Sequence, residues 1–210
     1  MQETVSQALY SYWNGLRAGR MAPKRFEIEP SCIAGNLPDT FILERVSQAT
    51  LRFRLAGTRV SETFGIDFRG VNLFQLFDEA DGKILERQIQ LSVSKGAVSV
   101  FRIRASSETK LSNDFEMLVL PLSHTRDSID RFLGSVTPVG KPHWLGTVAL
   151  TRRKLVGHET IWPDGAPADL AGPAHMREPL LPVVREARIV RSERRQFRVY
   201  EGGLGRPSNG

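Results

Sequence analysis

The chain has 210 residues, of which 40% are hydrophobic and 25% are charged, and its formal net charge is +6. That length can hold one domain with a full core and a sizeable extra segment, and the composition is globular rather than disordered. No run approaches the roughly 18 consecutive apolar residues that a membrane-spanning helix requires, and no secretory signal opens the chain. These features exclude a transmembrane protein.

The chain's only cysteine, Cys32, indicates the compartment. A lone cysteine cannot form an internal disulfide, which fits a reducing environment, and we therefore expect a cytoplasmic protein. No histidine lies near Cys32 in the sequence, so a small packed hydrophobe is a better interpretation than a metal ligand or a nucleophile.

The first predicted element is an amphipathic helix over residues 3–19. Its apolar side chains recur at three- and four-residue steps, and Gly19 is placed to end it. Pro23 and Pro30 then predict an extended, turning link, followed by one short helical turn over residues 33–37. The recurring apolar residues are Val5, Leu9, Tyr12, Trp13 and Leu16.

Two strands are predicted next, over about residues 41–47 and 50–56. The second alternates apolar residues with Arg52 and Arg54, which is the period of a strand with one buried face. Because only a very short turn separates the two strands, we expect an antiparallel hairpin.

A longer helix is predicted over residues 80–95, where apolar side chains form a stripe. Asp78 or Asp81 can cap its start, and Gly96 is placed to end it. Three further strands follow at 98–106, 115–122 and 131–136. We therefore expect an α+β fold, in which a five-stranded antiparallel sheet carries helices on one face.

The composition changes after Gly140. Six prolines break any long element in residues 141–184, which we therefore expect to be irregular and mostly exposed. The chain divides accordingly into an N-terminal helix at 1–22, a main domain at 23–140 and a proline-interrupted, basic C-terminal extension at 141–210.

Several motifs, in this order, resemble a PAS domain. The segment Thr58–Gly65 looks like the helix that follows the second strand of that fold, and Asp67–Gly70 resembles its polar turn. The run Leu73–Phe77 matches the apolar cover of the PAS cavity, and the opening Tyr12–Pro23 is similar to a subgroup of stand-alone PAS proteins found mainly in alphaproteobacteria. The resemblance covers about residues 8–140. It implies a sensory or regulatory adaptor in signal transduction that acts through protein–protein association.

The resemblance also implies a space between the sheet and its helices. Two interpretations stay open, because the apolar residues there can line a small-molecule pocket or can pack solidly and hold nothing. The candidates for the pocket are Phe53, Leu55, Phe64, Leu73, Phe74, Leu85, Ile89, Phe101 and Met117.

Two cofactor classes have signatures that this sequence lacks. Flavin-binding PAS domains carry a cysteine in an Asn-Cys-Arg-Phe-type run near the long helix, whereas Cys32 lies far upstream. Haem-binding PAS domains need an axial histidine, usually on the long helix or its neighbour, and residues 58–96 contain none. The sequence argues against flavin and haem, and leaves any other cofactor unknown.

Catalytic signatures are equally sparse. His124, His143, His158 and His175 are widely spaced, and none has the i,i+4 spacing of a helical metal pair. No nucleophile elbow or P-loop occurs, and the carboxylates are scattered. We expect that the protein is not an enzyme and that it has no metal site.

The Arg-rich tail supplies an alternative function. Residues 151–210 hold eleven Lys or Arg against seven Asp or Glu, so +4 of the +6 charge lies there. A binder of nucleic acid or of another anionic ligand needs such guanidinium density, although arginines at three-residue steps also form a solvated stripe. The anion-binding candidates are Arg188, Arg191, Arg194, Arg195 and Arg198.

The N-terminal helix offers a second candidate surface. Its apolar face can pack against the rest of the domain, or it can contact a protein partner or a second copy, since the resemblance to PAS proteins implies dimer contacts there. The interface candidates are Leu9, Trp13 and Leu16, and Arg17 and Arg20 form a basic cluster beside Trp13.

Overall fold

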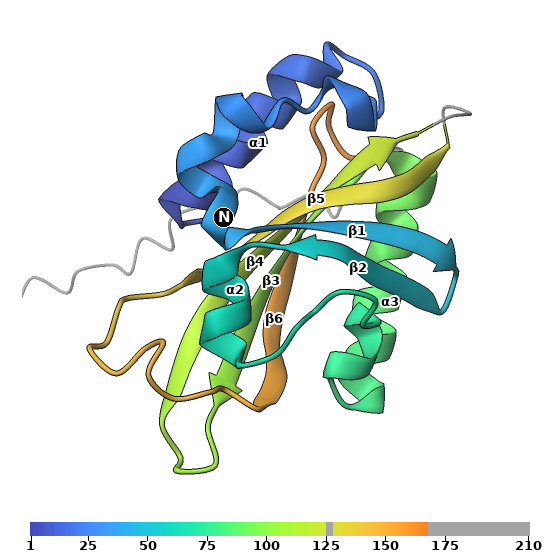
Figure 1. The fold of residues 1–210 in the computed structure, drawn as a ribbon. Coiled ribbons are helices and arrows are strands. Elements are labelled where there is room, and N and C mark those ends of the chain that lie inside the picture. Colours follow the sequence, from blue (N-terminus) through green and yellow to red (C-terminus); the bar gives the residue numbers. More distant parts are fainter. Residues whose placement is uncertain (125–127, 168–210) are drawn as a thin grey trace, which may run out of the picture. The chain divides into compact units, whose positions relative to one another are not determined.

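The computed structural model describes residues 1–124 and 128–167, which form one antiparallel sheet with helices packed on it (Figure 1). The strand order is β2-β1-β5-β4-β3-β6. The strands are β1 (Thr40–Ser47), β2 (Thr50–Ala56), β3 (Val98–Ser106), β4 (Ser112–Ser123), β5 (Ile129–Pro138) and β6 (Arg152–Ile161). The helices are α1 (Thr4–Arg17), α2 (Thr58–Phe64) and α3 (Glu79–Lys95), with 3-10 helices η1 (Arg25–Glu27), η2 (Pro30–Asp39) and η3 (Leu73–Leu76).

The helix boundaries follow from their caps. The Asp78 carboxylate accepts a hydrogen bond from the backbone N–H of Asp81 at 2.8 Å, which satisfies one of the free donors at the start of α3. Gly96 ends the same helix with a φ of +69°, a conformation that favours glycine because it has no Cβ. The predicted helix over 80–95 is therefore confirmed, and of its two candidate caps Asp78 is the one used.

Helices cover both faces of the sheet, whereas the sequence predicted them on one face. On one face, α2, η3 and α3 enclose a core that includes Phe41, Phe53 and Phe101. On the other face, α1 and η2 pack over Leu118 and Leu120 of β4 (Figure 1). The N-terminal helix is thus a second layer of the domain. Neither α1 nor any other helix of the described residues is long and apolar enough to cross a membrane.

The sheet contains six strands where the sequence predicted five. The additional strand, β6, lies inside the segment 141–184 that was expected to be irregular, and it pairs along the whole of β3. Val156 is an extra residue in this pairing, because Leu155 faces Ile103 while Gly157 faces Arg102. The backbone N–H of Leu155 donates to the Asp81 carboxylate at 2.8 Å instead. A side chain at the start of α3 therefore satisfies a buried donor at the bulge.

Candidate functional site

Most of the predicted pocket residues come together as one packed cluster. They lie between the sheet and the layer of α2, η3 and α3, where all but one are buried and Phe74 is partly buried against the others. The residues found there are Phe53, Phe64, Leu73, Phe74, Leu85, Ile89, Phe101 and Met117.

Aromatic rings fill the centre of this cluster. Phe53 and Phe68 have ring centroids 4.8 Å apart, and Phe64 contacts Phe68 at 5.9 Å and Phe115 at 5.3 Å. The cavity enclosed among these rings measures about 20 Å³, and a separate pocket of about 330 Å³, lined in part by Asp39, Arg59 and Glu62, lies outside them beside Phe64 and Phe115. The enclosed cavity holds about one water molecule, so the described arrangement of the rings is a filled core.

Leu55 is the predicted pocket residue that lies elsewhere. In β2, Phe53 pairs with Leu43 while Leu55 pairs with Ile42, so Arg54 is an extra residue that bulges out of the strand. A one-residue shift turns the following side chain to the opposite face of the sheet. Leu55 consequently lies on the α1 side, where it is 54% exposed, and its assignment to the pocket was wrong.

Arg153 of β6 closes one side of the aromatic cluster. Its guanidinium carbon lies 5.2 Å from the centroid of the Phe64 ring, and its Nη2 donates to the carbonyl oxygen of Leu150 at 3.3 Å. The Nε is buried and has no hydrogen-bond partner among the described residues. Burial lowers the pKa of Arg153, because it removes the charged group from water.

The interface candidates of the N-terminal helix are mostly buried within the molecule. Leu9 and Trp13 are fully buried against the sheet, and the indole N–H of Trp13 donates to the carbonyl oxygen of Pro121 at 2.7 Å. These two side chains therefore pack within the domain and are not exposed to a partner. Leu16 packs at the edge of the same cluster and is partly buried.

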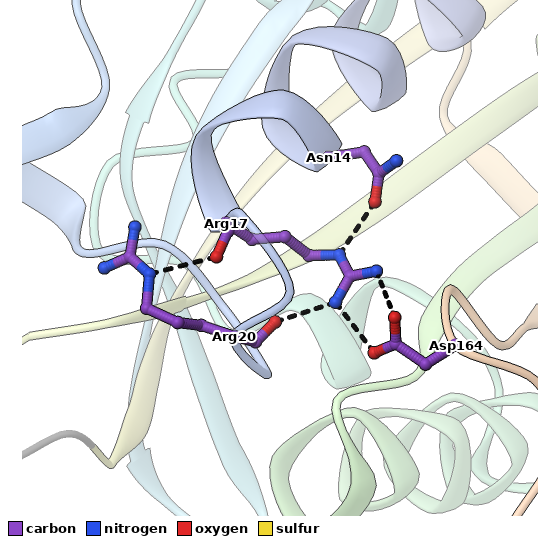
Figure 2. Close-up of polar contacts among 4 residues, drawn as sticks. All are labelled: Asn14, Arg17, Arg20 and Asp164. Atoms are coloured by element: carbon purple, nitrogen blue, oxygen red, sulfur yellow. Dashed lines mark hydrogen bonds and ion pairs between the residues drawn. The ribbon is translucent and has the colours of Figure 1, made fainter.

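Arg17, next to Trp13, is the centre of the most extensive polar contact of the molecule's described part (Figure 2). Its Nη1 and Nη2 donate to the two carboxylate oxygens of Asp164 at 2.8 and 2.6 Å. The Nε donates to Asn14 at 2.7 Å, and Nη1 also donates to the carbonyl oxygen of Arg20 at 2.8 Å. The buried guanidinium thereby joins the end of α1 to a residue that follows β6, 147 positions along the chain.

The electrostatics of this contact are asymmetric. The side chain of Arg17 is buried whereas that of Asp164 is 66% exposed. The hydrogen bond from Arg17 holds the pKa of the Asp164 carboxyl below its ordinary value, since it favours the charged form. We call this pair the terminal clamp, because it joins the helix before the sheet to the segment after it.

A buried carboxylate holds the other end of α1. Glu116 of β4 accepts hydrogen bonds from the backbone N–H groups of Gln2 and Glu3 at 2.7 and 3.1 Å. Glu116 is 2% exposed, so these donors provide much of its compensation for burial. Charged groups therefore hold both ends of α1, with Glu116 at its N-terminal end and Arg17 at its C-terminal end.

The remaining predictions fall outside these contacts. The anion-binding candidates Arg188, Arg191, Arg194, Arg195 and Arg198 lie outside the described residues. Within residues 1–124 and 128–167, no group of three or more His, Cys, Asp or Glu side chains could hold a metal ion.

The sequence reasoning missed the partners that give these sites their geometry. Arg17 was noted beside Trp13, but nothing in the turn that contains Asp164 signals a contact with a residue so distant in sequence. Glu116 sits in an apolar run, and a charged residue in a run that is predicted to be central in a sheet is itself a signal of a buried polar contact.

A comparison with protein families identifies the class of this domain. A family model described as PAS domain matches residues 1–137. The chain belongs to the PAS domain family. None of the curated proteins matches the sequence.

Solved structures add three similar chains, all of LOV proteins. A point variant of RsLOV is 16% identical with a TM-score of 0.40, over 51% of this chain and 64% of that chain. The LOV protein of Rhodobacter sphaeroides is 16% identical with a TM-score of 0.39, over 50% of this chain and 61% of that chain. The RsLOV d2 variant is 14% identical with a TM-score of 0.39, over 68% and 71%. The chain thus spans less than two thirds of the first two structures.

Proposed function

We propose that the chain is a regulatory adaptor that transmits a signal by associating with another protein. Membership of the PAS domain family supports a sensory role. The observation that carries the proposal is the terminal clamp, in which Arg17 binds Asp164 through two hydrogen bonds. This contact couples α1, which precedes the sheet in the sequence, to the segment that follows β6.

The mechanism is a shift between two arrangements of α1. Only the Asp164 side of the ion pair is exposed to water, so a partner can reach the clamp there, while the buried Arg17 guanidinium keeps its hydrogen bonds to Asn14 and to the carbonyl oxygen of Arg20. Glu116 holds the N-terminal end of α1 against the sheet. Opening of the clamp at Arg17 therefore frees the C-terminal end of α1 first. A partner that binds only one of the two arrangements shifts the population toward it.

A small molecule in the core is the second part of the proposal. The cavity of about 20 Å³ among the rings is too small for an organic ligand, so a ligand would enter between the rings only if they were displaced. Phe64 is the ring best placed to move, because it belongs to the short helix α2 and lies next to Arg153. The proposal assigns no catalytic step to the chain.

The test compares two bidentate Arg–Asp pairs. Asp164→Asn removes the carboxylate charge of the terminal clamp. Asp114→Asn removes the carboxylate charge of the matched control pair, in which Arg104 donates to Asp114 at 2.6 and 2.8 Å. We expect faster amide hydrogen exchange at the end of α1 in the first variant only. Crosslinking in the native cell, read by mass spectrometry, should show a partner whose capture changes with Asp164→Asn and not with Asp114→Asn.

Two results would contradict the proposal. Equal partner capture by both variants would show that the clamp has no regulatory role. Native mass spectrometry of the purified wild-type chain tests the ligand separately, since it reports bound small molecules and stoichiometry together. A chain with neither a bound molecule nor a partner would be left with a structural role alone.

A further inference from the structure

An apolar groove lies on the face of the sheet that α1 and η2 cover. It has a volume of about 520 Å³ and lies between η1 and η2 on one side and strands β1, β2 and β5 on the other. A volume of this size falls within the range of small-molecule sites, which is roughly 300–1,000 Å³. The apolar lining is made mainly by Ile28, Ile33, Leu37, Ile42, Leu55 and Leu133.

The bulge in β2 creates part of this lining. Because Arg54 is the extra residue, Leu55 turns toward the groove instead of the aromatic core. Leu55 is 54% exposed, so about half of this apolar residue's surface remains in contact with water in the free molecule. A ligand that covers it would recover the burial.

The charge in the groove is of one sign. Arg25 is the only ionisable residue that lines it, and no carboxylate does. Its guanidinium makes no hydrogen bond or ion pair with any residue in the part of the chain that the structure describes. The hydroxyl of Thr40 is already committed, since it donates to the carbonyl oxygen of Leu37 at 3.0 Å. The groove therefore offers an apolar surface and one available cation.

We propose that this groove binds a long-chain carboxylate, with the alkyl chain on the apolar lining and the acid on Arg25. A guanidinium binds a carboxylate through two parallel hydrogen bonds, and an alkyl chain needs no polar partner. A peptide would bring backbone N–H and C=O groups into a lining with few polar groups to pair them, which costs free energy. The site lies on the opposite face of the sheet from the core cavity, and it does not depend on the proposed adaptor function.

The experiment measures binding of two probes to the full chain by calorimetry. The probes are dodecanoate and dodecan-1-ol, each below its aggregation limit, because they share the alkyl chain and differ in the charged group. We expect saturable 1:1 binding of both, with dodecanoate the tighter. Arg25→Gln should weaken dodecanoate about tenfold, which corresponds to a lost hydrogen bond to a charged group, and leave dodecan-1-ol nearly unchanged.

Two further variants locate the site. Leu55→Asp places a charge in the groove at an exposed position, so it should weaken both probes strongly without disturbing the core. Val156→Asp is the matched control, because Val156 is 52% exposed and lies on β6, away from the groove. It should leave both affinities unchanged.

Three results would overturn the proposal. One is the absence of saturable binding by either probe, and another is an equal effect of Arg25→Gln on the acid and the alcohol. The third would assign the groove to a second copy of the chain. In that case sedimentation would show a dimer that Phe26→Ser converts to monomer, because Phe26 is 76% exposed and directly follows Arg25, which lines the groove.

Discussion

Gly134 in the middle of β5 shows how closely the sheet and its core are packed. It pairs with Phe41 of β1 and Val119 of β4. A Cβ at this position would overlap the ring of Phe41 and the carbonyl oxygen of Leu118. The position therefore requires glycine for space, while the backbone conformation there is ordinary.

Replacing this glycine should destabilise the fold. Gly134→Ala is expected to lower the free energy of unfolding by about 1–3 kcal/mol, because the ring and the backbone must move to admit a methyl group. Gly157→Ala is the control, since Gly157 also lies in a strand but a Cβ there meets nothing within 4 Å. Urea unfolding measures both, and equal stability of the two variants would contradict the packing at Gly134.

The sequence predicted residue burial well where the strands are regular. Phe53 and Phe101 lie in the core as their alternation indicated. Leu55 continues the same alternation in the sequence, yet the bulge at Arg54 reverses its direction. A bulge depends on how the neighbouring strand pairs, so the pattern of a single strand could not reveal it.

At the scale of elements, the start of α3 and the strand β6 depend on each other. Asp78 caps the helix, and Asp81, three residues later, accepts the hydrogen bond from the N–H of Leu155 in β6. The two aspartates therefore serve different elements, although either was a possible cap on sequence grounds.

Because their roles differ, replacing Asp81 and replacing Asp78 should lower the stability of the fold by different amounts. Asp81→Ala should destabilise the protein by about 1–3 kcal/mol, because it leaves the buried N–H of Leu155 without a partner. Asp78→Ala should cost about 1 kcal/mol through loss of the helix cap. Hydrogen exchange separates the two, since only Asp81→Ala should speed the exchange of Leu155. Protection of Leu155 that survives Asp81→Ala would rule out this role.

The helices and central strands were predictable because each has a local signal. Apolar periodicity and the caps Asp78 and Gly96 define α3, and the alternation of β3 is equally regular. Strand β6 was missed because its segment is surrounded by prolines and only Leu155 of its residues is buried. An edge strand with one buried apolar residue has little pattern to detect.

At the scale of the whole molecule, the terminal clamp responds to pH. The hydrogen bond from Arg17 lowers the pKa of Asp164 from its ordinary value of 3.8. A carboxylate with a lowered pKa in the folded state stabilises the fold above its unfolded pKa, and this contribution is lost as the pH falls through the lowered value. Protonation of Asp164 therefore does not disturb the clamp at neutral pH and weakens it only in acid.

An NMR titration checks this behaviour. In the wild-type chain the side-chain carboxyl carbon of Asp164 should titrate below pH 3.8, and in Arg17→Gln it should return toward that value. Asp114 serves as an internal reference, because the hydrogen bond from Arg104 lowers its pKa independently. A titration of Asp164 that is the same in both proteins would show that Arg17 does not bind it in solution.

The overall class could be predicted from the sequence, whereas the contacts that unite the molecule could not. The order of helix, hairpin, long helix and three strands sufficed for the PAS assignment, which the family match confirms. The second helical layer and the clamp depend on residues more than 100 positions apart, such as Trp13 with Pro121 and Arg17 with Asp164. The local sequence pattern around each residue does not indicate which distant residue it contacts.

The position of β6 at the end of the strand order has a consequence for solubility. Among the described residues no strand pairs with its outer side, and an open edge of this kind is a template for edge-to-edge aggregation. Exposed Arg152 and Lys154 place two like charges there, and the bulge at Val156 distorts the row of hydrogen-bonding groups. A growing fibril would have to desolvate both charges at every added layer, so the strand that completes the sheet also discourages its extension.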